Sequence, residues 1–119
     1  MKFPHEDLEV WQLAMDFSER IYKTTDGFPP SEKFGITSQV QRASVSIALN
    51  IAEGKGRYHN KEYKQFLYNA RGSLYETSTL ILLAKRLGYL KDRDYHELNE
   101  TSHKIMSKLS GLINYLKKD

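Results

Sequence analysis

The sequence of 119 residues contains no cysteine. Disulfide bonds, thiolate catalysis, cysteine-type zinc sites and cysteine-bound iron–sulfur clusters are therefore excluded. Neither sign of charge dominates, because 18 lysines and arginines are offset by 15 aspartates and glutamates. The resulting net charge of +3 permits an acidic partner such as a nucleic acid but does not require one.

Long apolar runs are missing as well. The longest run, residues 80–84, is far shorter than the roughly 20 residues that a helix needs to cross a bilayer. The N-terminus lacks the apolar core of a signal peptide, so we expect a cytoplasmic protein of a bacterial type with no membrane partner. A single domain usually has about 100–200 residues. We therefore expect residues 1–119 to form one domain without a separate catalytic module.

Glycine and proline are few, and most of them lie in three breaks near residues 27–30, 54–56 and 88. The four segments between the breaks carry apolar residues every three or four positions, the spacing of a helix with one buried face. We expect helices over residues 7–25, 38–53, 61–87 and 93–117. Four helices with short connections predict an all-α, antiparallel up-down-up-down four-helix bundle. The expected N-caps are Asp7, Thr37, Asn60 and Asp92, and the expected terminal glycines are Gly54 and Gly88.

The third predicted helix has two unusual features. Gly72 lies in its interior, where glycine costs about 1 kcal/mol relative to alanine, so we expect a close helix crossing at this position. The second half of the helix is apolar around most of its circumference. Because a four-helix bundle leaves one face of each helix open, a second subunit is expected to cover the remaining leucines. The expected subunit interface consists of Leu80, Leu82, Leu83 and Leu87.

Several short stretches go beyond periodicity. They are LEVWQLA at residues 8–14, a Gln-x-x-Arg-Ala run at residues 39–43, NIAEG at residues 50–54, and, later, residues 66–67, 72–73 and 87–89. Together they resemble the four-helix bundle family of 23S rRNA intervening-sequence proteins, also called the S23 ribosomal protein family. The resemblance covers nearly the whole chain.

The resemblance implies a homo-oligomer, in the form of a ring-like pentamer, with a nucleic-acid role and without an established biochemical activity. Family members are encoded within intervening sequences of 23S rRNA genes or stand alone. A related branch serves as the accessory protein of diversity-generating retroelements, where it partners a reverse transcriptase. The implied partners are thus further copies of the chain and RNA or a nucleic-acid-processing protein. Many relatives have two adjacent basic residues where this chain has Gln41 and Arg42, so one positive charge is missing there.

Basic residues are concentrated in the middle of the chain. Residues 38–71 carry six lysines and arginines against two glutamates, whereas residues 1–30 carry three against six acidic residues. Part of the basic set shares one face of the third predicted helix with Tyr68 and Tyr75, and such a mixture can hold phosphates and stack unpaired bases. The alternative is a solvated face whose tyrosines pack on a neighbouring helix. The expected nucleic-acid-binding residues are Arg42, Lys55, Arg57, Lys61, Lys64, Tyr68 and Arg71, extended by Tyr58.

A polar stripe on the second predicted helix has two interpretations. Its members, Arg42, Ser46, Asn50 and Glu53, recur every three or four residues. They form either a groove for a partner or a hydrogen-bond network between helices, with Tyr75 or Glu76 as the expected partner.

Catalytic and metal motifs are weak. His96, Glu100 and His103 share a helix face and could hold a metal in principle, but exposed polar positions explain them better, so we expect neither metal nor cofactor. We expect a protein that is not an enzyme. A small nuclease that uses residues 53, 57 and 59, with His59 as general base, is a weak alternative. The stronger alternative is an interaction scaffold that binds another protein and never contacts nucleic acid.

Overall fold

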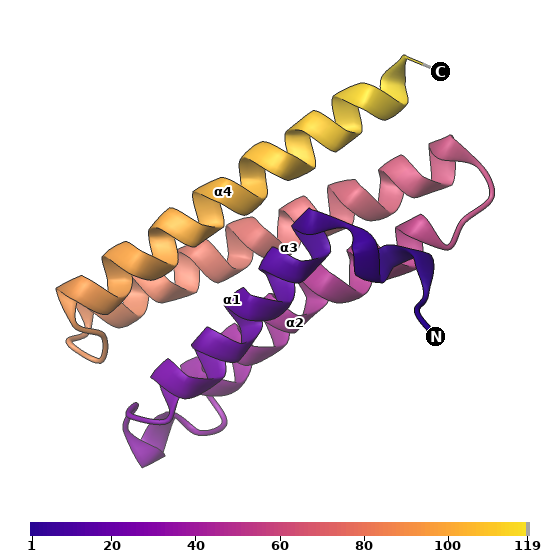
Figure 1. The fold of residues 1–119 in the computed structure, drawn as a ribbon. Helices are drawn as coiled ribbons and strands as arrows, with labels where there is room; N and C mark the ends of the chain where they lie inside the picture. The colour runs from indigo at the N-terminus through magenta and orange to yellow at the C-terminus, as the bar shows by residue number, and fades with distance from the viewer. Residues whose placement is uncertain (119) are drawn as a thin grey trace.

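The computed structural model describes residues 1–118 and contains four long helices (Figure 1). The helices are α1 (Glu9–Thr25), α2 (Ile36–Lys55), α3 (Asn60–Arg86) and α4 (Asp92–Lys117). Two short 3-10 helices, η1 (Pro4–Asp7) and η2 (Pro30–Glu32), precede α1 and α2. Every predicted helix is confirmed, with each boundary within two residues of its expected place, whereas η1 was not predicted.

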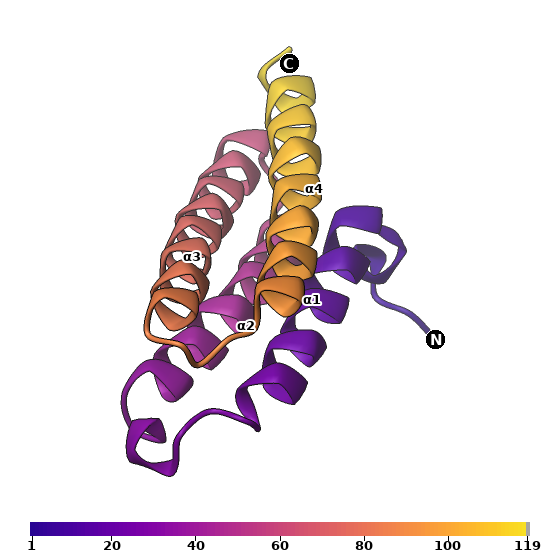
Figure 2. The same cartoon turned by 90° about the vertical axis from the view of Figure 1, so that its left-hand side faces the viewer.

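The four helices form the expected up-down bundle. Each helix packs against the next one in the chain, and α1 also packs against α4, which leaves α1 diagonally opposite α3 (Figure 2). The molecule is elongated, with extents of 46, 26 and 22 Å. None of the helices described in residues 1–118 is apolar over a length that could cross a bilayer.

The apolar stripes seen in the sequence meet in one core. Each helix contributes fully buried side chains, among them Phe17, Ile47, Leu67 and Leu109. Burying an aliphatic or aromatic side chain of this size stabilises the fold by about 1.5–3 kcal/mol. Packing of these stripes therefore accounts for most of what holds the helices together.

Gly54 and Gly72 do not have the roles that the sequence indicated. A Cβ atom added to Gly54 would lie 2.9 Å from Cβ of Phe66 and 2.9 Å from Cδ1 of Tyr63, so α2 approaches α3 closely there. Gly54 consequently lies inside α2 instead of ending it. The crossing expected at Gly72 is wrong, because Gly72 is exposed and an added Cβ would meet no atom within 4 Å. Gly88, at φ +82°, follows α3 as expected, since glycine adopts this conformation without strain.

The predicted N-caps are also wrong. The residues that precede the helices are Leu8, Gly35, His59 and Lys91, and none of them makes a side-chain cap hydrogen bond. Three of these four residues have extended backbone, so the path of each connection fixes where its helix begins. At α2, the carboxylate of Glu32 accepts a hydrogen bond from the backbone N–H of Ile36 at 3.4 Å.

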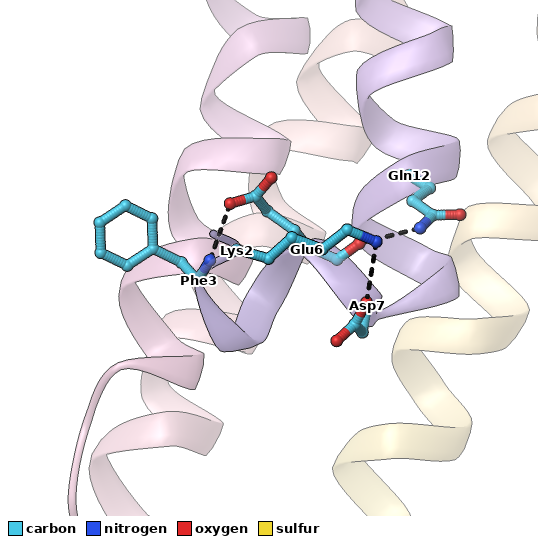
Figure 3. Close-up of polar contacts among 5 residues, drawn as sticks. All are labelled: Lys2, Phe3, Glu6, Asp7 and Gln12. Carbon is cyan, nitrogen blue, oxygen red and sulfur yellow. Dashed lines mark hydrogen bonds and ion pairs between the residues drawn. The ribbon is translucent and has the colours of Figure 1, made fainter.

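The N-terminal turn η1 is fastened across the start of α1 (Figure 3). The backbone N–H of Phe3 donates to the Glu6 carboxylate at 2.8 Å, and the Gln12 side chain donates to the backbone oxygen of Glu6 at 2.8 Å. Lys2 and Asp7 form an ion pair at 3.4 Å. The turn therefore has a defined position, and it packs against both α1 and α2.

Candidate nucleic-acid interface

The basic residues in the middle of the chain have no carboxylate partners. Ion pairs within residues 1–118 use five other basic side chains: Lys2, Arg20, Lys85, Arg93 and Lys108. Their charges are partly neutralised by neighbouring aspartates and glutamates. In residues 38–71 all six basic side chains lack an ion pair, and their charges stay available to a polyanion: Arg42, Lys55, Arg57, Lys61, Lys64 and Arg71.

The α2–α3 connection holds two cations on aromatic rings. The guanidinium carbon of Arg57 lies 4.6 Å from the centroid of the Phe66 ring, and Nζ of Lys55 lies 5.9 Å from the centroid of the Tyr63 ring. Tyr58 is 92% exposed, and its ring packs edge-on against His59. We call Lys55, Arg57 and Tyr58 the loop cluster. It presents two positive charges beside an accessible aromatic ring.

A second set of basic residues lies along α3. The guanidinium carbon of Arg71 is 5.0 Å from the centroid of the Tyr68 ring, which itself packs against the core. Lys61 is exposed and Lys64 is half-buried. We call Lys61, Lys64, Tyr68 and Arg71 the helix cluster. The alternative interpretation was a solvated face whose tyrosines pack on a neighbouring helix. Tyr68 fits it, because that ring packs against the core, but Tyr75 does not, because it is 61% exposed.

The two clusters do not form one continuous patch. Arg57 lies on the ring of Phe66, and Arg71 lies on the ring of Tyr68. These two rings are two residues apart on α3, a rotation of about 200° around the helix axis, and so they face nearly opposite sides of the helix. Arg42 belongs to neither cluster. It lies 13 residues before Lys55 on α2, which is about 20 Å along the helix.

The polar stripe of α2 is a helix-to-helix network. The side-chain amide of Asn50 donates to the backbone oxygen of Ser46 at 2.8 Å, and the hydroxyl of Ser73 donates to that of Ser46 at 2.9 Å. The network interpretation is confirmed for these residues, but the partner on α3 is Ser73 and not Tyr75 or Glu76. Arg42 and Glu53 are exposed and stay outside the network.

The metal and nuclease constellations gain no support from the geometry. Within residues 1–118, no three histidine, aspartate or glutamate side chains are placed to hold a metal ion, so the spacing of His96, Glu100 and His103 does not create a site. In the nuclease set, Arg57 lies on Phe66 and His59 packs against Tyr58. No contact in the described residues joins either side chain to Glu53.

Two tyrosines have altered acidity. Burial raises the pKa of Tyr63, and its hydroxyl is buried without a hydrogen-bond partner among the described residues. The hydroxyl of Tyr89 donates to the Glu32 carboxylate at 2.9 Å, and this hydrogen bond is the main reason why the pKa of Tyr89 is raised. Tyr89 thereby ties the α3–α4 connection to η2, at the end of the bundle opposite the loop cluster.

An apolar groove between α1 and α2 was not predicted. It has a volume of about 660 Å³, and three of its lining side chains are strongly exposed: Met15 at 42%, Tyr22 at 49% and Leu49 at 56%. The ring of His5 packs edge-on against Trp11 at 5.0 Å, so the N-terminal turn closes one end of the groove. The spacing of Trp11, Met15 and Tyr22 could have indicated an apolar row beside the core stripe of α1.

The leucines of α3 divide into a buried and an exposed group. Leu80 is 9% exposed and belongs to the core, where it lines a small internal pocket with Phe28 and Leu90. Because Leu80 is buried within its own chain, it needs no second subunit to cover it. Leu82, Leu83 and Leu87 are 42%, 45% and 50% exposed, and we call these three the leucine ridge.

Comparison with known proteins identifies relatives of the same architecture. The family model described as "23S rRNA-intervening sequence protein" matches residues 6–111. The crystal structure of a protein with unknown function from the S23 ribosomal protein family of Bacteroides thetaiotaomicron superposes with a TM-score of 0.79. It shares 25% sequence identity, over 87% of this chain and 97% of that chain. None of the curated proteins compared with this chain matches it.

Proposed function

Since the chain belongs to the 23S rRNA-intervening sequence protein family, we propose that it is a non-enzymatic, homo-oligomeric accessory protein that binds RNA. The loop cluster and the helix cluster are the contact surfaces. One observation carries the proposal: within residues 1–118 the cations of both clusters have no carboxylate partner, and three of these cations lie against aromatic rings. A nucleic-acid backbone supplies the missing negative charge.

The chemistry of the loop cluster favours unpaired RNA over a regular duplex. Tyr58 is almost fully exposed and offers an aromatic face on which an unstacked base can lie. Arg57 is held against Phe66, so its side chain loses less conformational freedom when it contacts a phosphate. Phosphate contacts to Lys55 and Arg57 would fix the strand while the ring of Tyr58 receives a base.

The proposed working unit is a homopentamer, which the family resemblance implies. The exposed leucine ridge supports assembly, because three neighbouring leucines at about half exposure form an apolar surface that water disfavours. Assembly raises RNA affinity, since each copy adds two or three weak phosphate contacts and linked sites act at a high effective concentration. A nucleic-acid-processing partner, such as the reverse transcriptase of a diversity-generating retroelement, would meet RNA already held on this surface.

Salt-dependent RNA binding tests the proposal. Affinity of the wild type for a single-stranded RNA is measured across a salt series, together with Lys55→Ala/Arg57→Ala and with Lys61→Ala/Lys64→Ala/Arg71→Ala. Each lost phosphate contact on a single strand lowers the slope of log K against log salt by about 0.7, so the loop variant should lose about 1.4 for each copy that contacts the strand. The matched control is Lys33→Ala/Lys91→Ala, which removes two exposed charges at the opposite end of the bundle.

The outcomes separate the candidate functions. Unchanged affinity and slope in both cluster variants would contradict RNA binding and leave the interaction scaffold as the better hypothesis. Cleavage of the RNA by the purified protein, abolished by His59→Ala, would instead show a nuclease and contradict a non-enzymatic role.

A further inference from the structure

A small notch lies between α3 and α4, which pack side by side (Figure 2). Its volume is about 130 Å³, well below the roughly 300–1,000 Å³ of a site for a drug-sized molecule. The notch therefore has room for one flat ring but not for a larger ligand. We call it the α3–α4 notch, and it is lined by Leu74, Tyr75 and Ser78 from α3 and by Ser102, His103 and Met106 from α4.

The notch combines an apolar base with free polar groups. Leu74 is buried and Met106 is half-buried, and both belong to or pack against the core. The side chains of Tyr75, Ser78 and His103 make no hydrogen bond within residues 1–118. A few converging polar groups over an apolar base are typical of a ligand site, so these three side chains are free to hydrogen-bond to a ring that fills the notch.

The ring of Tyr75 forms the open wall of the notch. It is 61% exposed, and within residues 1–118 it contacts neither another aromatic ring nor a cation. Tyr68 differs, because its ring packs against the core and holds Arg71. A free aromatic face such as that of Tyr75 can stack on a flat ring from outside the chain.

The notch continues the helix cluster along α3. One row of residues joins them: Lys64, Tyr68, Arg71, Tyr75 and Ser78. These residues recur at intervals of four, three, four and three positions, so they follow one face of the helix. Tyr75 lies about 6 Å beyond Arg71 along the helix axis. A strand whose phosphates contact Lys64 and Arg71 would therefore pass directly over the notch.

Charges beside the notch indicate which part of a strand it takes. Glu76 follows Tyr75 on α3, while Glu100 and Lys104 flank His103 on α4, and all three charged side chains are exposed. Two carboxylates against one ammonium group disfavour a phosphate at this place. The notch therefore suits an uncharged base, while the phosphates of the strand stay on the helix cluster.

We propose that the α3–α4 notch binds one unpaired base of a single-stranded RNA whose phosphates lie on the helix cluster. The base stacks on Tyr75, and the hydroxyl of Ser78 and the imidazole of His103 hydrogen-bond to its polar edge. A regular duplex cannot supply such a base, because its bases are already paired and stacked. This inference rests on the proposed RNA binding and adds the residues that select an unpaired base.

The test measures RNA affinity and its salt slope together. The probes are a single-stranded RNA of about 12 nucleotides and a strand of the same length that lacks all bases. Tyr75→Ala should weaken binding of the normal strand by at least about 5-fold, as expected for the loss of one stacked base. His103→Ala should weaken it by about 2–10-fold, as expected for one hydrogen bond. The salt slope should stay unchanged in both variants, because no phosphate contact is lost.

The baseless strand and three further variants provide the controls. The baseless strand should bind the wild type and Tyr75→Ala equally. Tyr115→Ala and His96→Ala remove exposed side chains of α4 that do not line the notch, and both should keep the wild-type affinity. Tyr75→Phe keeps the ring and should retain most of the affinity that Tyr75→Ala loses. Equal losses in these two variants would contradict stacking on Tyr75.

The outcomes distinguish this proposal from the proposed function. If the wild type binds no RNA, the proposed function is wrong and the notch proposal is wrong with it. If the cluster variants lose salt slope while Tyr75→Ala and His103→Ala bind as the wild type does, RNA binding stands and the notch proposal alone is wrong. If Tyr75→Ala weakens binding of the baseless strand by the same factor, Tyr75 contacts the strand backbone, which also refutes the base site.

Discussion

Replacement of Gly54 by alanine tests the close approach of α2 and α3, which positions the rings under the loop cluster. A Cβ at this position would lie 2.9 Å from atoms of both Phe66 and Tyr63 and 3.2 Å from the backbone oxygen of Tyr63. Carbon atoms pack best at about 3.5–4.0 Å, so the two helices must separate by at least about 0.6 Å. The contacting atom of Phe66 is its Cβ, which cannot rotate away.

The size of the effect follows from two opposing terms. Overpacking of this kind costs about 1–3 kcal/mol, and the better helix propensity of alanine returns up to about 1 kcal/mol. We expect a net loss of about 1–2 kcal/mol, or a fall in melting temperature of about 4–8 °C for a domain of this size. The measurement is thermal and urea denaturation followed by circular dichroism, at two protein concentrations so that subunit dissociation is separated from unfolding.

Gly111→Ala is the matched control, because Gly111 is an exposed glycine of α4 where an added Cβ meets nothing within 4 Å. This substitution should raise stability by up to about 1 kcal/mol. A Gly54→Ala protein that is as stable as the wild type would refute the close approach. A folded Gly54→Ala variant should also bind RNA more weakly than Gly111→Ala, since the rings beneath Lys55 and Arg57 have moved.

Three other substitutions have expected outcomes. Ser18→Ala should stabilise the chain by about 1 kcal/mol, as measured by urea denaturation. The Ser18 hydroxyl is buried without a hydrogen-bond partner among the described residues, and burial of such a group costs free energy. A loss of stability would contradict this explanation. Glu32→Gln should lower the pKa of Tyr89 toward its ordinary value near 10, as followed by NMR of labelled tyrosine. With Glu32 present, the Tyr89 contribution to stability is full below the unfolded pKa and is lost as pH rises through the raised folded pKa. In the variant the folded and unfolded pKa values are closer, so this loss of stability at high pH should be smaller. Arg20→Ala, which breaks a half-exposed ion pair with Glu97, should cost less than about 1 kcal/mol in the same urea titration, and a larger loss would show that the pair does more than a surface ion pair.

Apolar periodicity was sufficient to predict the four helices and their order, because one stripe on each helix is buried in one shared core. It could not predict which glycine lies at the helix crossing. Gly54 and Gly72 look alike in the sequence, and only the position of Tyr63 and Phe66 on the facing helix distinguishes them. The predicted N-cap residues were wrong for a related reason, because the extended connections determine where the helices begin.

The candidate site was predicted in composition but not in shape. The sequence showed that basic residues are concentrated in positions 38–71. It did not show that Arg57 turns toward Phe66 and Arg71 toward Tyr68, because it does not fix the path of the connection. The groove was not predicted because its lining side chains come from two different helices. The row of Trp11, Met15 and Tyr22 can be seen on α1, but Leu49 joins it only through the packing of α1 on α2.

The loop cluster directly precedes α3, and the leucine ridge lies at the other end of that helix. Lys61, the second residue of α3, and Leu83 are 22 residues apart, which is about 33 Å in a molecule 46 Å long. In a ring made by one repeated contact, every copy has the same orientation relative to the symmetry axis. In a ring whose axis runs parallel to α3, all loop clusters would emerge on a single rim, and the opposite rim would be free of them. A bound RNA would have to follow a closed curve on that rim, so strand length and bending stiffness would influence affinity as much as base sequence does.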